Sequence, residues 1–197
     1  MGDPNLTILI IEENAVRAAI LEEGMRDAGY CHIQRIADMA NLLNKICAVD
    51  PDVIVIGLEN PSRDTLEQMF QVSRSVRRPI AMFVDISDTA TIEAAVDAGV
   101  SAYVVDGLKK ERVRPILDVT ISRFHVFRRL QEELVQAREA LEARKMIERA
   151  KGILMKQQNL GEQEAYSLMR RTAMSQKRKL YDIAQSVVTA AQMFGQS

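Results

Sequence analysis

Short apolar runs alternate regularly with helical patterns through the first half of this 197-residue chain. The predicted strands are 6–11, 31–36, 52–56, 79–84 and 102–105, and the predicted helices are 14–28, 39–48, 63–74 and 88–98, with Gly29 as a helix stop. Strands that alternate with helices form parallel βαβ units. The sequence therefore predicts an α/β doubly wound, five-stranded parallel sheet of flavodoxin-like type, whose site lies at the carboxyl ends of the strands.

The pattern changes after residue 110. From Lys110 to about Gln158 no strand pattern occurs, and the only helix-breaking residues are Pro115 and Gly152. Proline is tolerated in the first turn of a helix. This stretch therefore predicts one long helix.

Apolar residues recur along this helix at spacings of three and four, as in a coiled coil. The seam comprises Phe127, Leu130, Leu134, Ala137 and Leu141, and charged residues flank it. We expect a parallel homodimer through this coiled coil. The alternative is a single long helix that packs within its own chain.

The last 50 residues predict three helices with one small core: the end of the long helix at 146–157, then 162–174 and 180–193. Two carboxylates in the first turn of the second helix favour the helix dipole. We predict three parts: 5–122 as the α/β domain, 110–145 as the coiled-coil helix, and 144–194 as the small helical domain.

Charge is distributed unevenly along the chain. Residues 143–197 hold ten basic and four acidic residues, a net charge of +6, whereas the preceding residues hold 16 and 23, a net charge of −7. A basic end domain favours contact with a polyanion. The alternative is that it merely balances the acidic part.

Composition limits the classes of protein. The 47% hydrophobic content is that of a globular chain, no apolar stretch is long enough to span a membrane, and the start resembles no signal peptide, so we expect a cytoplasmic protein. Cys31 and Cys47 stand in apolar surroundings and predict half-buried free thiols. His32 and His125 are far apart, and no metal-ligand spacing occurs, so we expect neither metal nor cofactor.

Residues 6–122 resemble a two-component receiver domain. The resemblance rests on the strand order, the acidic pair Glu12-Glu13, Pro51-Asp52 before the third strand and Ala98-Gly99 before the fifth. In receivers, the acidic pair and an aspartate hold Mg²⁺, the aspartate accepts the phosphoryl group, and a Thr or Ser and a Lys contact its oxygens.

This chain departs from the receiver pattern at three of these positions. The acceptor position falls on Gly57, the Thr or Ser position on Val84 and the Lys position on Asp106. Glycine has no nucleophile, valine has no hydroxyl, and Asp106 would repel a phosphoryl group. Glu59 is a weak alternative acceptor.

We therefore predict a pseudo-receiver, kept for protein contact rather than phosphotransfer. Only the acidic pair Glu12 and Glu13 remains. It is either a weak cation site or, as we expect, a solvated loop pair at the sheet edge.

Residues 144–194 resemble the ANTAR domain of RNA-binding antiterminators. The motifs are Ile147-Glu-Arg-Ala-Lys-Gly-Ile-Leu-Met155, Glu164-Ala-Tyr166 and Leu180-Tyr-Asp-Ile-Ala184. The resemblance implies binding of paired hairpins with six-nucleotide loops in messenger leaders, which prevents a terminator from forming.

Three further segments resemble the nitrate/nitrite-responsive members of this family: Ser62-Arg-Asp-Thr-Leu66, Val84-Asp-Ile-Ser-Asp88 and Tyr103-Val-Val-Asp-Gly107. That resemblance implies a nitrate- or nitrite-sensing partner protein, which sequesters the regulator in place of phosphorylation control.

The candidate RNA-binding residues are mostly basic, because phosphate contacts supply salt-dependent affinity. They are Arg149, Lys151, Lys156, Tyr166, Arg170, Arg171, Lys177, Arg178 and Lys179. Tyr166 either stacks on a base or packs in the core. Gly152 costs about 1 kcal/mol in mid-helix, which is reasonable if another helix or an RNA backbone approaches there; Ala150 and Ala165 also predict close packing.

Other classes of function are less well supported. A DNA-binding response regulator lacks a helix-turn-helix pattern here, so we do not expect DNA as the target. Gly57 argues against a phosphotransfer module, and the basic domain argues against a pure dimeric scaffold. No Gly-rich phosphate loop or nucleophile elbow supports an enzyme.

Overall fold

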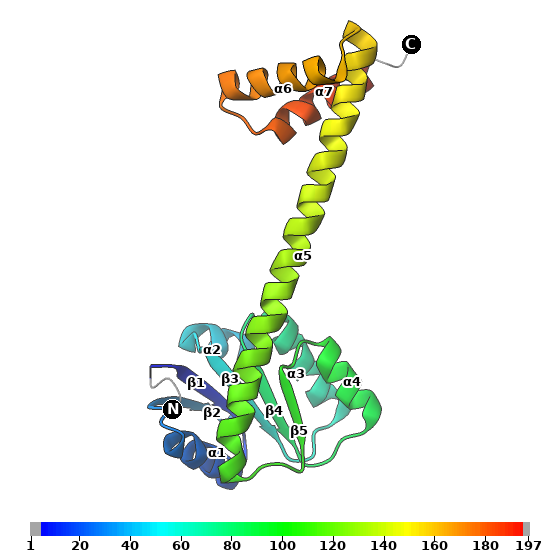
Figure 1. Ribbon diagram of the computed structural model, residues 1–197. Coiled ribbons are helices and arrows are strands. Elements are labelled where there is room, and N and C mark those ends of the chain that lie inside the picture. The colour runs from blue at the N-terminus through cyan, green and yellow to red at the C-terminus, as the bar shows by residue number, and fades with distance from the viewer. Residues whose placement is uncertain (1–4, 195–197) are drawn as a thin grey trace. The chain divides into compact units, whose positions relative to one another are not determined.

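The computed structural model describes residues 5–194 and contains one parallel five-stranded sheet in the order β2-β1-β3-β4-β5 (Figure 1). The strands are β1 (Thr7–Ile11), β2 (His32–Ile36), β3 (Val53–Leu58), β4 (Ile80–Val84) and β5 (Ala102–Val105). The helices between them are α1 (Ala15–Asp27), α2 (Leu42–Val49), α3 (Arg63–Ser75) and α4 (Thr89–Asp97). The α/β doubly wound fold predicted from the alternating pattern is confirmed.

The sheet is buried on both faces because successive strand residues point to opposite sides. On one face, Ile8 and Ile10 pack with residues of α1 and with Val113 and Leu117 of the helix that follows β5. On the other face, Leu9 and Ile11 pack with α2, α3 and α4. All residues of β3 and β4 are buried, which explains their continuous apolar runs.

Polar side chains fix where the helices begin. The side chain of Asn14 accepts hydrogen bonds from the first turn of α1, Ser62 does so for α3, and Asp88 for α4. Gly29 follows α1 with a φ of 94°, a left-handed conformation that glycine adopts without strain. Gly29 therefore ends the helix as predicted.

The long helix α5 runs from Lys110 to Gln158, close to the extent that the sequence predicted. The chain divides into two compact units between Arg128 and Arg129, so α5 contributes to both. No helix among residues 5–194 is long and apolar enough to cross a membrane.

The second unit contains the end of α5, α6 (Glu162–Gln176) and α7 (Leu180–Phe194). One core joins the three helices and includes Ala150, Leu154, Ala165, Met169, Ala173, Ile183, Ala184 and Val188. Ala150 and Ala165 are fully buried, so their predicted close packing is confirmed. Helix α6 runs two residues further than predicted and ends where Lys177 adopts a left-handed conformation.

The predicted burial of the cysteines is wrong, whereas their prediction as free thiols is confirmed. Cys31 and Cys47 are both exposed rather than half-buried, and both are free thiols. Cys31 precedes the edge strand β2, and Cys47 lies on the outer side of α2, so the apolar neighbours in sequence point inward while the thiols do not.

Candidate functional site

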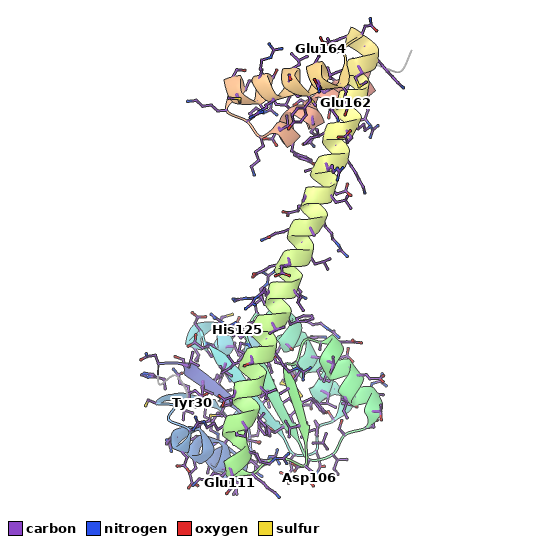
Figure 2. All side chains as sticks on the ribbon, viewed as in Figure 1. Tyr30, Asp106, Glu111, His125, Glu162 and Glu164 are labelled. Atoms are coloured by element: carbon purple, nitrogen blue, oxygen red, sulfur yellow. The ribbon has the colours of Figure 1, made fainter. Side chains whose placement is uncertain are left out.

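The receiver positions gather at the carboxyl edge of the sheet. Glu12 follows β1, Gly57 is the fifth residue of β3, Val84 ends β4, and Asp106 follows β5 (Asp106 is labelled in Figure 2). The register pairs Gly57 with Phe83, and Leu58 with Val84. All of these residues lie at the same edge of the sheet, because they end or follow parallel strands.

Glu12 is a buried residue, and the expectation of a solvated loop pair is wrong for it. It is 2% exposed, and β1, which it follows, is an inner strand of the sheet. Its Oε1 accepts a hydrogen bond from the backbone N–H of Asn14 at 2.9 Å, and its Oε2 accepts one from Nε of Arg17 at 2.9 Å. Only Glu13 is exposed as predicted.

The side chain of Glu12 fills the space beside Gly57. A Cβ built on Gly57 would overlap Oε2 of Glu12 and would lie 3.0 Å from its Cδ. A side chain at position 57 therefore requires the carboxylate of Glu12 to shift. Position 57 has no nucleophile, and the space beside it is occupied by Glu12.

Arg17 lies between two carboxylates from different strand ends. Its Nε donates to Glu12, and its Nη1 donates to Asp85 in the loop after β4. Burial lowers the pKa of Arg17, but the hydrogen bonds to Glu12 and Asp85 more than offset this, so the pKa is raised and the group stays charged.

A second arginine, Arg35 of β2, contacts the backbone of the loop that follows β1. Nε of Arg35 donates to the carbonyl of Glu12 at 3.1 Å, and its Nη2 donates to the carbonyl of Glu13 at 3.1 Å. Glu59, the alternative acceptor, accepts a hydrogen bond from Nδ2 of Asn14 at 3.1 Å. The sequence reasoning missed Arg17, Arg35 and Asp85, because only the fold brings them to the acidic pair.

The remaining two receiver positions offer no phosphoryl ligand. Val84 is buried in the apolar core. Asp106 has a left-handed backbone with a φ of 48°, and its N–H donates to the carbonyl of Val84. Within residues 5–194, no group of three or more His, Cys, Asp or Glu side chains is arranged to hold a metal ion.

A basic stripe runs along one face of the last turns of α5. Lys145, Arg149, Gly152 and Lys156 follow one another at spacings of four, three and four, which places them on the same helix face. Lys145 pairs with Glu142, while Arg149 and Lys156 are exposed and have no ion pair within residues 5–194.

Gly152 lies in the middle of this stripe, and the space around its Cβ position is open. Apart from the neighbouring backbone of α5 itself, no atom of the described residues comes within 4 Å of a Cβ built there. The expectation that another helix of the chain packs closely against Gly152 is wrong within the part of the chain described. An approach by a ligand backbone remains the other interpretation.

Lys151 points to the opposite side, toward α6. Its side chain is 10% exposed, and its Nζ pairs with Glu148 at 2.8 Å and with Glu162 at 2.7 Å. Hydrogen bonds to these two carboxylates raise the pKa of Lys151. The geometry therefore contradicts the prediction that Lys151 is available to RNA phosphate, because two carboxylates already neutralise it.

The exposed face of α6 carries Tyr166, Arg170 and Met174 at spacings of four residues, with Arg171 beside them. Tyr166 is 41% exposed. Tyr166 is not part of the buried core of this unit, so the alternative that it packs in the core is wrong.

The basic residues between α6 and α7 differ in whether their side chains have hydrogen-bond partners within the described part of the chain. Arg178 is tethered to α7, since its Nη2 donates to the carbonyl of Asp182 and to Oγ of Ser186. Lys177 and Lys179 are exposed and have no ion pair within the described residues.

The predicted seam of α5 is uncovered in the single chain. Phe127, Leu130, Leu134 and Leu141 are between 51% and 58% exposed, and Ala137 is exposed as well. Every residue from His125 to Glu142 is exposed (Figure 2). This stretch therefore has no packing partner within the described residues of either unit.

Comparison with known proteins assigns both units. Residues 135–188 match the ANTAR domain family. The α/β unit has the fold of a CheY-like response regulator receiver domain from Methanospirillum hungatei JF-1, with a TM-score of 0.53 and 14% identity over 61% of this chain and 98% of that one. The chain thus joins a receiver fold to an ANTAR domain.

Two regulatory proteins are similar in sequence. The transcriptional regulatory protein PdtaR of Mycobacterium tuberculosis is 28% identical over 181 residues, which cover 92% of this chain and 88% of PdtaR. The nitrate regulatory protein of Klebsiella oxytoca is 32% identical over 76 residues, which cover 39% of this chain and 19% of that protein.

Proposed function

We propose that this protein is an RNA-binding transcription antiterminator. It binds paired stem-loops with six-nucleotide loops in leader mRNA and prevents a terminator from forming. The observation that carries the proposal is the ANTAR match over residues 135–188, which contains exposed and unpaired basic residues on two helices. The similarity to PdtaR, a transcriptional regulatory protein, supports it over most of the chain.

RNA contact uses two surfaces of the ANTAR unit in this proposal. The stripe on α5 contributes Arg149 and Lys156, and the exposed face of α6 contributes Tyr166, Arg170 and Arg171; Lys177 and Lys179 add charge nearby. Cationic side chains meet phosphates and release counterions, whereas an aromatic ring stacks on an unpaired base. Lys151 and Arg178 support the helices that carry these residues.

Control does not need phosphorylation of the receiver unit. Position 57 has no nucleophile, and Glu12 and Arg17 fill the site. We propose that a nitrate- or nitrite-sensing protein sequesters the regulator, as the resemblance to the antiterminator NasT and its sensor NasS implies. The target genes are then those of nitrate assimilation, and the match to a nitrate regulatory protein supports this.

A second copy of the chain covers the seam of α5. Helices in proteins are stabilised mainly by packing of their apolar face, and this stretch has no such packing in the single chain. With Phe127, Leu134 and Leu141 at one core position of the heptad, Glu133 and Arg138 flank the seam on opposite sides. In a parallel pair each faces the other on the partner helix, and opposite charges there favour this orientation.

A gel-shift titration tests RNA recognition. The full chain is titrated against an RNA with two hairpins of six-nucleotide loops and against duplex DNA of equal length, at two salt concentrations and without any phosphodonor. We expect tight, RNA-selective binding. Equal and weak binding to both, lost at the higher salt, would mean that the ANTAR unit is only a basic surface and that the chain is a dimeric scaffold.

Matched variants locate the contact surface. Arg170→Gln with Arg171→Gln should weaken RNA binding and reduce the slope of log affinity against log salt by about 0.7 to 0.9 per lost phosphate contact. Arg114→Gln with Arg26→Gln removes two exposed charges from the receiver unit and should change neither. Selective binding of DNA over RNA would instead favour a DNA-binding response regulator.

A further inference from the structure

Three charged side chains fill the receiver site from within. Glu12 comes from the end of β1, Arg17 from the first turn of α1, and Asp85 from the loop after β4. Glu12 is almost fully buried, Arg17 is nine-tenths buried, and Asp85 is partly exposed. A buried charge is stable only when an opposite charge and hydrogen bonds compensate it. Arg17 provides both for Glu12.

The carboxylate of Glu12 is already paired with a guanidinium, whose positive charge would repel a metal ion. One carboxylate oxygen accepts from the N–H of Asn14, and the other accepts from Nε of Arg17. The guanidinium also reaches Asp85, which lies 68 residues further along the chain. A positive charge therefore already bridges the ends of two strands, without any ion from solution.

The position of Arg17 includes one energetically unfavourable feature. Its third nitrogen, Nη2, is buried and has no hydrogen-bond partner within residues 5–194. An unsatisfied buried donor is unfavourable. The two ion pairs, with Glu12 and Asp85, nevertheless hold the arginine in this place. We therefore attribute its position to these ion pairs and not to hydration of the guanidinium.

We propose that the guanidinium of Arg17 is an internal counter-ion that takes the place of a divalent cation and holds the loop after β4 in one conformation. This inference is independent of the proposed RNA binding.

The loop in question begins with Asp85 and ends with Asp88, the N-cap of α4. Between them, Ile86 is 72% exposed, and Oγ of Ser87 hydrogen-bonds to the hydroxyl of Tyr103 at 3.0 Å. Because Arg17 fixes the start of this segment, its exposed surface stays the same whether or not Mg²⁺ or a phosphodonor is present. A protein that docks on this surface then meets a constant shape.

The first test measures binding of Mn²⁺ as a spectroscopic probe, from the electron paramagnetic resonance signal of the free ion. The parent protein and Arg26→Met, a control on the exposed part of the same helix, should leave millimolar Mn²⁺ free. Arg17→Met keeps the volume of the side chain but removes the charge, and it should gain Mn²⁺ binding. Adding Glu12→Gln to Arg17→Met should abolish that gain.

Two results would overturn the proposal. Mn²⁺ binding by the parent protein that Glu12→Gln removes would mean that Arg17 does not replace the cation. Absence of any gain in folded Arg17→Met would mean that Arg17 is only a packing residue. Circular dichroism establishes whether each variant is folded.

The second test does not depend on the folding of Arg17→Met. Asp85→Asn changes a partly exposed side chain and leaves the Glu12–Arg17 pair in place. Amide hydrogen exchange at residues 86–88 should become about tenfold faster, since one charge-assisted hydrogen bond is lost, while exchange in α1 stays unchanged. Unchanged exchange at residues 86–88 would show that the Ser87–Tyr103 contact and the N-cap suffice, and would overturn the role of Arg17 in holding the loop.

Discussion

The carboxylate of Glu12 lies where the side chain of residue 57 would have to be, with its Cδ 3.0 Å from a Cβ built on Gly57. Because Arg17 and Asn14 hold this carboxylate, Gly57→Ala should destabilise the receiver unit by about 1–3 kcal/mol through overpacking. Urea unfolding measures the change. Combining Gly57→Ala with Glu12→Ala should remove the part of the loss that comes from the clash; an additive result would contradict this.

The same relationship predicts the outcome of restoring the acceptor. Gly57→Asp should form no stable acyl phosphate with a small-molecule phosphodonor and Mg²⁺. The new side chain would collide with the carboxylate of Glu12, which Asn14 and Arg17 hold. Val84 and Asp106 offer neither a hydroxyl nor a lysine to the phosphoryl oxygens. Mass spectrometry and acid–urea gels detect the adduct, and its appearance would show that Glu12 can move aside.

Substitution of Gly152 should affect the stability of the ANTAR unit and its affinity for RNA in opposite directions. Apart from the neighbouring backbone of α5 itself, no atom of the described residues lies within 4 Å of its Cβ position, so Gly152→Ala should stabilise the ANTAR unit by about 1 kcal/mol. If an RNA backbone approaches the helix between Arg149 and Lys156, the same methyl group should weaken RNA binding. Thermal unfolding and gel shift measure the two effects, and unchanged RNA affinity would move the contact elsewhere.

Tyr166 is the aromatic residue that the structure leaves available on α6. Tyr166→Leu should weaken RNA binding by about 1–3 kcal/mol, the range for stacking of one base. The free energy of unfolding should change little, because the ring is substantially exposed. Tyr166→Phe is the matched control and should bind almost as the parent does. Equal loss in both variants would indicate that the hydroxyl, not the ring, makes the contact.

A substitution in the seam of α5 should change the mass of the protein in solution. Leu134→Lys places a charge in the centre of the apolar stripe and should shift the protein toward a monomer in analytical ultracentrifugation. Arg129→Lys, outside the seam, should not. A monomeric parent protein without RNA would instead mean that RNA brings the two copies together.

The Lys151–Glu162 pair predicts a pH dependence. The hydrogen bond from Lys151 lowers the pKa of Glu162 below its ordinary value of 4.5. A lowered folded-state pKa stabilises the fold above the unfolded pKa, and this contribution is lost as the pH falls through the folded value. The difference in unfolding free energy between the parent and Glu162→Gln should therefore begin to shrink as the pH falls below about 4.5 and should vanish only below the lowered pKa of folded Glu162. Glu139→Gln, an exposed change outside this pair, should show no such trend.

The secondary-structure elements of this chain depend on residues close in sequence, whereas the surroundings of its side chains depend on residues far apart in sequence. Continuous apolar runs and helical spacings of three and four residues were sufficient to predict the sheet, the order of helices and strands, and the approximate extent of α5, because such patterns depend only on near neighbours. The receiver positions could also be aligned, since each directly follows or ends a strand. The side-chain environments could not. Cys31 and Cys47 were predicted to be half-buried from apolar neighbours in sequence, but side chains of neighbouring residues point in different directions.

The sequence by itself determined that this protein has a receiver fold without the receiver's acceptor aspartate, hydroxyl or lysine, and that a basic ANTAR domain follows a long helix. Only the tertiary structure decided that Glu12 is buried, that Arg17 bridges it to Asp85, and that Lys151 is held by Glu162. The reason is physical: an ion pair or a steric overlap depends on distances of a few ångströms between segments far apart in the chain, and those distances are set by the packing of strands and helices.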